Sequence, residues 1–349
     1  MFYKIKALHE EGIIIKLHCF SYGRPKQTEL NKYCEEVNYY ERKTGLRGFS
    51  FTQPYIVHSR ASPELLENLL KDDYPVLMEG VHCTAFLPQV MKKKKAILRL
   101  HNVEGKYYWE LFKSETSLFK KSFFLSESTA LSKYEKKLPV DLLTITVSEK
   151  DASYYKNDLG KRNVKFLPVF IPFSEITTEE GMGNYCLYHG NLGVPENNKA
   201  AIWLLNKVFS KIKVPFVIAG KNPSKRLIKL ANAHKNTNLV GNPPDIEMTD
   251  LINKAHINIL PSFNSTGIKL KLIHALFKGK HCVVNEAAVE GSGVESACYI
   301  GTNANAMVSI VAELYNRPFT EEEISLRSRL LPSLFNNRIN AQQLIQWIW

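Results

Sequence analysis

Apolar and polar residues alternate in blocks along the whole chain, and each block predicts a strand or a helix. In the first half, strands are predicted at 13–20, 75–78, 96–100 and 142–147, with helices at 1–10, 63–70 and 107–137. In the second half, strands at 185–189, 216–219, 237–240 and 257–260 alternate with helices at 196–211, 224–233 and 245–254. The segment 164–173, which contains two prolines, predicts an extended linker between the halves. Strands that alternate with helices indicate an α/β protein with parallel sheets.

The segment after strand 257–260 predicts an anion-binding turn. A polar turn closes on Gly267, and the helix behind it runs to Gly279, where the strand 282–284 follows. Its predicted apolar face consists of Leu270, Ile273, Leu276 and Phe277. The start of a helix presents free backbone N–H groups and the positive end of the helix dipole. Lys269 and Lys271 add positive charge there, but they point about 200° apart on a helix, so at most one faces a ligand directly.

Composition allows two domains and favours an anionic partner. The 349 residues, with 44% hydrophobic and 23% charged residues, are typical of a globular protein of that size. The net charge of +12 suits a nucleotide, a phospholipid surface or a nucleic acid. Six cysteines are scattered without a CxxC pair, which indicates reduced thiols in a cytoplasmic protein. Neither a membrane-spanning stretch nor a signal peptide is visible in the sequence, so we expect any membrane contact to be at the surface.

Several stretches of the chain together resemble the GT-B-fold glycosyltransferases, and among these the retaining family 4 group. The stretches lie at 98–104, 146–151, 188–198, 217–223, 239–243 and 267–279. The resemblance implies an α/β protein with two Rossmann-like domains facing a central cleft. Residues 1–172 would form the acceptor-side domain, and residues 173–349 the domain for the nucleotide-sugar donor. The terminal helix 341–349 resembles the one that crosses back to the first domain in this fold.

The chain departs from the family pattern at three places. Thr266 and His274 stand where family 4 enzymes usually carry two glutamates, and Asn191 replaces the usual arginine. The chain also opens with the predicted helix 1–10, so we expect the first strand of the domain and its glycine-rich loop, about 15–25 residues, to be missing. A late start, a truncation or a degenerate domain would each explain this.

Five residues of the first domain are candidates for catalysis and acceptor binding. His101 directly follows strand 96–100, at the carboxyl end where ligands bind in open parallel sheets. The resemblance implies that it contacts the reacting sugar, and with Glu104 it forms the predicted catalytic pair. Glu79, His82 and Asn102 are predicted on the acceptor side. The alternative for His101 is a hydrogen bond to the backbone, and for the others an ordinary loop or helix-start position.

The resemblance places nine residues at the donor site: Gly190, Asn191, Lys221, Asn242, Thr266, Gly267, Lys269, Lys271 and His274. The lysines would stabilise the diphosphate leaving group, and the glycines would let the backbone approach it. Asn242 lies in the loop that holds the base in the family, and His274 at the position that reaches the ribose. A solvated helix face is the alternative for the lysine pair, and a satisfied core histidine for His274. The sequence contains no metal-binding motif, as expected for the metal-independent chemistry of this fold class.

These features predict a glycosyltransferase that moves a sugar from a UDP- or GDP-sugar to a hydroxyl of a glycan or lipid-linked glycan. By resemblance we expect retention of configuration, no cofactor and a role in polysaccharide biosynthesis. The basic run Lys92–Lys95 and the aromatic stretch Tyr107–Trp109 suggest contact with anionic lipids at the inner face of the membrane, although most charge runs are merely solvated. A non-catalytic or truncated GT-B domain that binds a nucleotide or sugar is the alternative. Nucleic-acid binding is not expected, because no recognised module or basic helix with interleaved aromatic residues is present.

Overall fold

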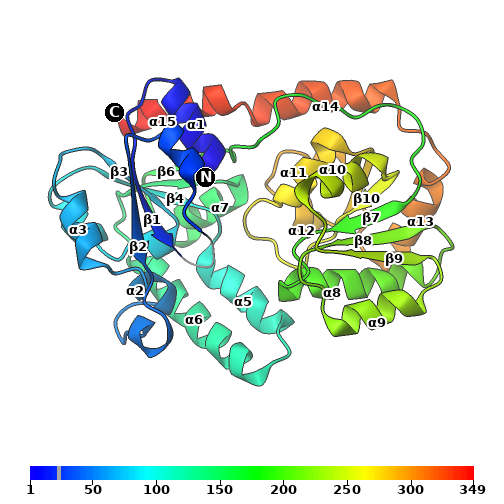
Figure 1. Ribbon diagram of the computed structural model, residues 1–349, viewed down its shortest axis with the longest axis horizontal. Helices are drawn as coiled ribbons and strands as arrows, with labels where there is room; N and C mark the ends of the chain where they lie inside the picture. Colours follow the sequence, from blue (N-terminus) through cyan, green and yellow to red (C-terminus); the bar gives the residue numbers. More distant parts are fainter. Residues whose placement is uncertain (22–24) are drawn as a thin grey trace. The chain divides into compact units, whose positions relative to one another are not determined.

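The computed structural model describes residues 1–21 and 25–349, which fold into two compact units. The first unit comprises residues Met1–Trp109, Ser122–Pro172 and Phe335–Trp349. The second comprises Glu110–Lys121 and Phe173–Leu334. The main passage between the units falls between Pro172 and Phe173, and the last helix belongs to the first unit (Figure 1).

The first unit is built on a four-stranded parallel sheet with the order β3-β4-β5-β6. Its strands are β3 (Val76–Glu79), β4 (Ala96–Leu100), β5 (Leu143–Thr146) and β6 (Val164–Phe166). The central strands β4 and β5 are buried along their whole length, which explains their continuous apolar sequence. The linker predicted at 164–173 is wrong for its first part, because β6 pairs with β5 from Thr144↔Val164 onward. A three-residue edge strand before the prolines is too short to show a periodic pattern.

A second, two-stranded parallel sheet in this unit joins β1 (Lys16–Ser21) to β2 (Glu36–Glu41). The pairing runs from Lys16↔Glu36 to Ser21↔Glu41. We did not expect β2, because its polar composition lacks the apolar alternation that signals a strand. Only Tyr40 of β2 is buried, so this strand is held by pairing with β1 more than by core packing.

The helices of the first unit cover both faces of its four-stranded sheet. They are α1 (Phe2–Glu10), α2 (Tyr55–His58), α3 (Pro63–Leu69), α4 (Leu87–Met91), α5 (Glu104–Ser114), α6 (Leu118–Lys137), α7 (Glu149–Ser153) and α15 (Asn337–Ile348). The end of α5 and the start of α6, within Glu110–Lys121, belong to the second unit. The single long helix predicted at 107–137 is wrong, because the chain breaks between α5 and α6. There Glu115 Oε1 accepts hydrogen bonds from the backbone N–H groups of Thr116 (2.8 Å) and Ser117 (2.9 Å). The side chain thereby replaces helical partners and allows the turn.

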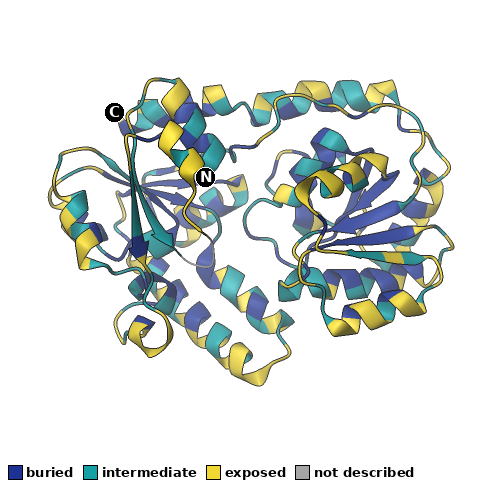
Figure 2. Cartoon of the chain, in the orientation of Figure 1, coloured by how far each residue is buried: buried dark blue, intermediate teal, exposed yellow. Residues whose placement is uncertain are grey.

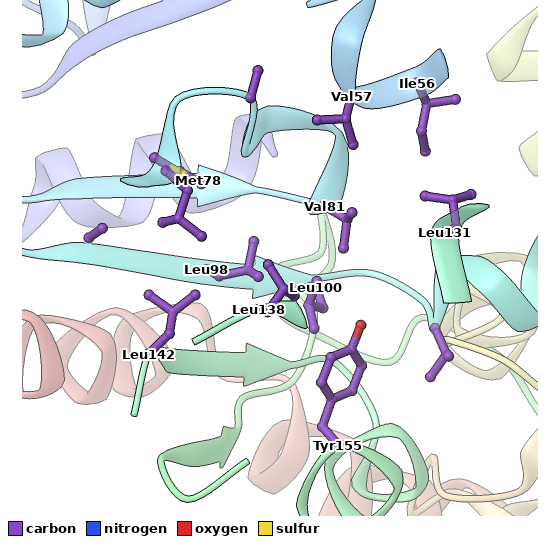
Figure 3. Close-up of a cluster of buried hydrophobic side chains, with 14 of the residues drawn as sticks. Ile56, Val57, Met78, Val81, Leu98, Leu100, Leu131, Leu138, Leu142 and Tyr155 are labelled. Carbon is purple, nitrogen blue, oxygen red and sulfur yellow. The ribbon is translucent and has the colours of Figure 1, made fainter. Parts of the chain in front are cut away.

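Two apolar clusters stabilise this sheet from opposite faces. Leu98 and Leu100 of β4 belong to the cluster in Figure 3, together with Leu131 of α6 and Tyr155. Ile97, directly before Leu98 in the sequence, belongs to a second cluster that contains residues of the first and last helices. Its helical members are Ala7, Leu8, Ala341, Leu344 and Ile348. Because successive strand residues point to opposite faces, the apolar run of β4 serves both cores, and α15 closes one of them.

The second unit contains a six-stranded parallel sheet with the order β12-β11-β10-β7-β8-β9. The strands are β7 (Cys186–His189), β8 (Phe216–Gly220), β9 (Thr237–Gly241), β10 (Ile257–Ile259), β11 (His281–Val284) and β12 (Tyr299–Ile300). Figure 2 shows that the middle strands of this sheet are buried. The chain moves outward from β7 to β9 and then from β10 to β12 on the other side. The strand order therefore reverses between β7 and β10, where open α/β sheets bind their ligands.

The helices of the second unit are α8 (Pro195–Leu204), α9 (Lys225–Ala233), α10 (Asp245–Lys254), α11 (Leu270–Lys278), α12 (Glu286–Val289), α13 (Ala304–Leu314) and α14 (Glu321–Leu334). Helix α11 begins and ends as predicted, with Gly279 as its C-cap. Ile273, Leu276 and Phe277 are buried, but Leu270 is 59% exposed, contrary to the predicted apolar face. It occupies the first helical position, at the end of the packed surface. No helix formed by residues 1–21 and 25–349 is long and apolar enough to cross a lipid bilayer.

Candidate functional site

In the first unit, Glu79 and His101 meet at the carboxyl edge of the sheet. Glu79 ends β3 and pairs in register with Arg99 of β4, so His101 emerges beside it. Glu79 Oε2 lies 3.0 Å from His101 Nε2 and 3.7 Å from Arg99 Nη1, while Oε1 pairs with Lys4 of α1. The structure thus brings two predicted residues into direct contact, and Lys4 and Arg99 complete a cluster that the sequence did not indicate.

This cluster fixes the charge of Glu79 and the orientation of His101. Burial alone would raise the pKa of Glu79, but Lys4, the hydrogen bond with His101 and Arg99 together hold this pKa well below its usual value. An ionised carboxylate accepts, so Nε2 of His101 donates and Nδ1 of the neutral ring is left unprotonated. The His101 side chain is 38% exposed, whereas that of Glu79 is 9% exposed. His101 can therefore reach a ligand, and the buried Glu79 holds the imidazole in place through their hydrogen bond.

His82 lies against the turn that follows β3. Gly80 has a φ of +94°, and a Cβ there would lie 2.5 Å from the imidazole of His82, so only glycine fits. Burial, followed by the electrostatic effects of Arg60 and of His101, lowers the pKa of His82 to about 3. His82 is therefore neutral at pH 7, and the structure brings it near His101 and Glu79 as predicted for one site.

Glu104 begins α5 and is buried rather than presented to solvent. Burial and then the nearby Glu135 raise the pKa of Glu104 to about 7, while a hydrogen bond with Asn102 acts in the opposite direction. Glu135 caps the helix: its carboxylate accepts the N–H groups of Glu104 (2.8 Å) and Gly105 (3.1 Å) and the hydroxyl of Tyr155 (2.6 Å). Glu104 is thus poised to exchange a proton near neutral pH. Sequence reasoning missed Glu135, because no local signal marks a cap supplied by another helix.

In the second unit, Lys271 forms the centre of a polar network at the end of β7. Its Nζ lies 3.1 Å from both Tyr188 Oη and Asn197 Oδ1, and 4.5 Å from the centre of the Tyr188 ring. Burial lowers the pKa of Lys271 to about 8, with Glu196 acting against this and Lys269 adding to it. Lys269 instead donates to the carbonyl of Thr266 (2.6 Å). Lys269 is the N-cap and Lys271 the second residue of α11, and the two lysines have different partners; of the pair, only Lys271 is shown bonded to a residue of β7.

The turn before α11 is held by Asn264. Its Oδ1 accepts from both the N–H and the hydroxyl of Thr266, each at 2.9 Å. Thr266 is 5% exposed, and Gly267 follows with a φ of +61°, in the left-handed region. Thr266, which stands where the family usually has a glutamate, therefore uses its hydroxyl inside the turn and supplies no charge.

Two histidines lie next to this network with unsatisfied nitrogens. His189 ends β7 and is 4% exposed; His274 stacks on Phe173 with 4.8 Å between ring centres. Their rings are 6.3 Å apart, and within residues 1–21 and 25–349 the Nε2 atom of each is buried without a partner. Burial and then Lys271 lower the pKa of His189 to about 3, and burial also lowers that of His274. We did not predict His189, although it follows an apolar strand just as His101 does.

The loops after β7 and β8 approach each other through glycines. A Cβ on Gly220 would lie 1.8 Å from the carbonyl oxygen of Gly190, so no side chain fits at this position. Asn191 is exposed; its Oδ1 accepts from Gly193 N (3.1 Å), and its carbonyl accepts from Asn197 (3.0 Å). Lys221 follows Gly220 and is exposed at this same edge of the sheet. The predicted residues Gly190, Asn191 and Lys221 therefore lie in neighbouring loops.

Asn222 and Asn242 join the next two loops in an uncommon backbone conformation. Their φ angles are +54° and +56°, a region that residues other than glycine rarely adopt. Asn242 Oδ1 accepts from Asn222 N (2.8 Å), and Asn242 N donates to the Gly220 carbonyl (2.8 Å). Such local strain persists where the surroundings hold it in place, often at a ligand site. Asn222 was not predicted.

The basic run Lys92–Lys95 is not a uniform solvated face. Lys94 turns inward, with its Nζ 2.8 Å from Asp72 Oδ1 and its side chain 2% exposed. Asp72 also binds Lys16 of β1 at 3.1 Å. The remaining lysines of the run are exposed, and lipid contact by them stays a prediction. Among the described residues, no group of three His, Cys, Asp or Glu side chains could hold a metal ion.

Similarity searches place the chain beside one curated relative. It is 32% identical over 284 residues to an uncharacterized 44.6 kDa protein in the cps region of Klebsiella pneumoniae, covering 76% of this chain and 71% of the relative. No protein-family model matches the sequence.

Solved structures similar to this one are glycosyltransferases at low sequence identity. A sucrose-phosphate synthase from Thermosynechococcus elongatus has a TM-score of 0.69 at 14% identity, covering 99% of this chain and 90% of that one. A glycosyltransferase from Rickettsia africae has a TM-score of 0.65 at 12% identity, covering 99% and 93%. A mutant of TarM from S. aureus, in complex with fondaparinux, alpha-GlcNAc-glycerol and UDP, has a TM-score of 0.59 at 14% identity, covering 82% of this chain and 57% of that one. These likenesses confirm the predicted GT-B fold, without singling out family 4.

Proposed function

We propose that this chain, which belongs to the same family as the cps-region protein of Klebsiella pneumoniae and has the GT-B fold, is a glycosyltransferase. It would move a sugar from a nucleotide-diphosphate sugar to a hydroxyl group of an acceptor. The observation that carries the proposal is Lys271, a half-buried cation with neutral hydrogen-bond partners at the strand-order reversal of the second sheet. The site has a cation without an anionic hydrogen-bond partner, and the negative charge of a diphosphate would supply that partner.

The donor would bind to the second unit. Lys271 would pair with the diphosphate, and Lys221 and Lys269 would add positive charge around it. As the glycosidic bond breaks, the departing diphosphate gains negative charge, which a preorganised cation stabilises. Gly190 and Gly267 would let the backbone approach the phosphates, and the Asn242 loop would face the base. We propose UDP- or GDP-sugars as donors.

The acceptor would bind to the first unit, at His101. Because Glu79 accepts from Nε2, the unprotonated Nδ1 of His101 can accept a proton or a hydrogen bond from an acceptor hydroxyl. His82 and Asn102 would contribute neutral contacts. Glu104, with its pKa near 7, would then exchange the proton that His101 takes from the acceptor hydroxyl. A glycan or lipid-linked glycan made during polysaccharide biosynthesis is the acceptor class we propose.

Metal independence, retention of configuration and a family 4-like mechanism are further parts of the proposal, and they rest on the resemblance. Proton NMR of the first-formed product distinguishes retention from inversion. Thr266 and His274, in place of two glutamates, make this the sharpest mechanistic question about the enzyme. A β-linked product from an α-linked donor would replace retention with inversion and leave the transferase proposal intact.

The second candidate is a GT-B domain that binds a nucleotide or sugar without transfer. It is favoured by the internal hydrogen bonds of Thr266 and by the ring stack that holds His274, since neither residue presents a carboxylate to the donor. Donor binding without transfer or donor hydrolysis would support this candidate over the enzyme.

The experiment is thermal stabilisation of the chain by UDP, GDP, ADP, CMP and their sugars. We expect one diphosphate to raise the melting temperature, and Lys271→Ala to abolish the shift. Lys229→Ala, which removes an exposed lysine of α9, is the matched control and should leave the shift unchanged. A folded chain that no nucleotide stabilises would contradict the donor site. A transfer assay with the stabilising donor then separates the two candidates.

A further inference from the structure

A groove between α5 and α6 has no role in the function proposed above. It has a volume of about 460 Å³, within the usual range of ligand pockets. Its walls include Lys106, Trp109, Thr129, Ser132, Lys133 and Lys136. All of these belong to the first unit.

Small residues at the helix crossing create the groove. The hydroxyl of Ser128 donates to the carbonyl of Gly105 (2.8 Å). A Cβ on Gly105 would lie 2.3 Å from Ser132 Oγ, so the two helices could not approach this closely with any larger residue. Small residues and hydroxyl groups therefore line the groove beside the longer side chains of both helices.

The edges of the groove are positively charged. Lys106 stands on α5, and Lys133 and Lys136 stand on α6; all three are exposed, and no acidic residue lines the groove. The acids that act on Lys106 are Asp158, Asp151 and Glu135; none of them lines the groove, and Glu135 is buried as the cap of α5. Lys133 and Lys136 are three residues apart on α6, and Lys106 Nζ also lies 3.3 Å from the centre of the Tyr154 ring. A set of exposed lysines without an acidic residue in the lining suits a negatively charged ligand.

Trp109 supplies a flat apolar wall. It is 41% exposed, an uncommon exposure for so large an aromatic side chain. The negative face of an indole ring attracts the positively polarised C–H groups of a sugar ring, and the N–H at its edge can donate a hydrogen bond. Thr129 and Ser132 add hydroxyl groups that can both donate and accept. An aromatic wall, hydroxyls and exposed lysines together match a sugar that carries a carboxylate.

We propose that this groove binds an acidic sugar unit of the acceptor, with its carboxylate on the lysines and its ring on Trp109. The inference rests on the proposed function and narrows it to acceptors that contain uronic-acid-type residues. The groove begins at the first turn of α5, directly after His101 and Asn102 in the chain. A glycan held there would extend from the edge of the sheet at which the acceptor hydroxyl is activated.

The test uses two tetrasaccharides that differ in charge. The full chain is titrated by calorimetry with tetragalacturonate and with maltotetraose. We expect tetragalacturonate to bind about tenfold or more tightly than maltotetraose, and its affinity to fall as salt rises from about 50 to about 500 mM. Replacing Lys133 and Lys136 together by alanine should weaken tetragalacturonate binding about tenfold, and Trp109→Ala should weaken both sugars.

Two controls keep the result specific. Replacing Lys92 and Lys93 by alanine removes the same charge from exposed positions outside the groove and should change the affinity less than about twofold. Replacing Lys133 and Lys136 by arginine keeps the charge and should preserve binding. Equal binding of the two tetrasaccharides, or equal losses in the groove and control variants, would overturn the proposal.

The same samples are tested for stabilisation by nucleotides, which concerns the second unit. Tetragalacturonate binding without any nucleotide binding would support the groove and contradict the transferase. Nucleotide binding without a preference for tetragalacturonate would be consistent with the transferase proposal and would contradict the proposal of an acidic acceptor.

Discussion

The two units differ in how they treat buried polar groups at the carboxyl ends of their strands. In the first, Glu79 meets Lys4, Arg99 and His101, so that opposite charges face each other. In the second, Lys271 has neutral partners, and His189 and His274 carry buried nitrogens without a partner in the described part of the chain.

Arg99 Nε of the first cluster also has no partner among the described residues, but the cluster's charges are paired with one another. Paired opposite charges keep their positions without a ligand, whereas buried polar atoms without a partner are costly until a ligand pairs with them. In the function proposed above, the base would therefore lie in the first unit, and the charged ligand would bind to the second. Variants in each unit test this assignment, and they differ in which property they change.

The largest effect is expected for Glu79→Gln in the first unit. This change leaves Lys4 and Arg99 buried without a countercharge and should lower the free energy of unfolding by about 3–5 kcal/mol. Because the pKa of Glu79 is depressed in the fold, its contribution is present above the unfolded pKa and is lost as the pH falls through the folded pKa. Urea denaturation at pH 7 and at lower pH measures both features.

Asp141→Asn is the matched control for Glu79→Gln. It removes the partner of Arg162 in an ion pair whose side chains are both 72% exposed, so stability should hardly change. Equal losses in the two variants would mean that the charge cluster around Glu79 does not stabilise the first unit.

A pH-dependent loss of donor affinity is expected from Lys271 in the second unit. Its pKa is lowered to about 8, so the ammonium group loses its proton as the pH rises through that value. Affinity for the stabilising nucleoside diphosphate should fall about tenfold between about pH 7 and pH 9.5. Calorimetric titration across this range measures it. Lys271→Arg stays charged and should bind with little dependence on pH; a wild-type affinity that is flat with pH would exclude Lys271 as the diphosphate ligand.

Glu104→Gln in the first unit is expected to raise the free energy of unfolding, by less than Glu79→Gln lowers it. Burial raises the pKa of Glu104 to about 7, so the unfolded chain releases this proton at lower pH than the folded one. The wild type therefore loses stability between the unfolded value near 4.5 and about pH 7, and the neutral glutamine avoids the loss.

Above pH 7 we expect Glu104→Gln to be more stable than the wild type by about 1–3 kcal/mol, and below pH 4.5 the difference should vanish. Melting temperatures of the wild type and of Glu104→Gln from pH 4 to pH 8 measure this difference in stability. A difference that does not depend on pH would show that Glu104 keeps its charge in the fold. Any loss of transfer by a variant that is more stable would point to proton exchange by Glu104.

The smallest effect is expected for Asn242 in the second unit. Asn242→Ala keeps a Cβ in the left-handed region, which alanine tolerates less well than asparagine, and removes the hydrogen bond to Asn222 N; the change should cost about 1–2 kcal/mol. Asn242→Gly relieves the backbone and loses only the bond, so it should be the milder change. Chemical denaturation ranks the two variants. If Asn242→Ala were less destabilising than Asn242→Gly, the left-handed backbone at this position would not be a source of strain.

Much of the second sheet was predictable because its signals are local. The buried strands have continuous apolar runs, and α11 is bounded by the turn at Gly267 and the cap at Gly279. The same reasoning failed at β2, which is polar, at β6, which has three residues, and at the break between α5 and α6. In each case a pairing or a side-chain cap outweighed the periodic pattern.

The candidate residues show the same division. The position of His101 at the end of a strand follows from the apolar run before it, and the position of Lys271 in the first turn of a helix follows from the turn that closes on Gly267. Their partners do not follow: Glu79 finds Lys4 across 75 residues, and Lys271 finds Tyr188 across 83.

The sequence by itself determined most of the strands and helices and which side chains follow the predicted strands, since both depend on neighbours within a few residues. Tertiary structure alone decided which charges are neutralised, which histidine nitrogens stay unpaired, and that Trp109 and three lysines share a groove. These outcomes depend on burial and on contacts between distant segments. Neither burial nor such contacts can be predicted from a residue's neighbours in the sequence.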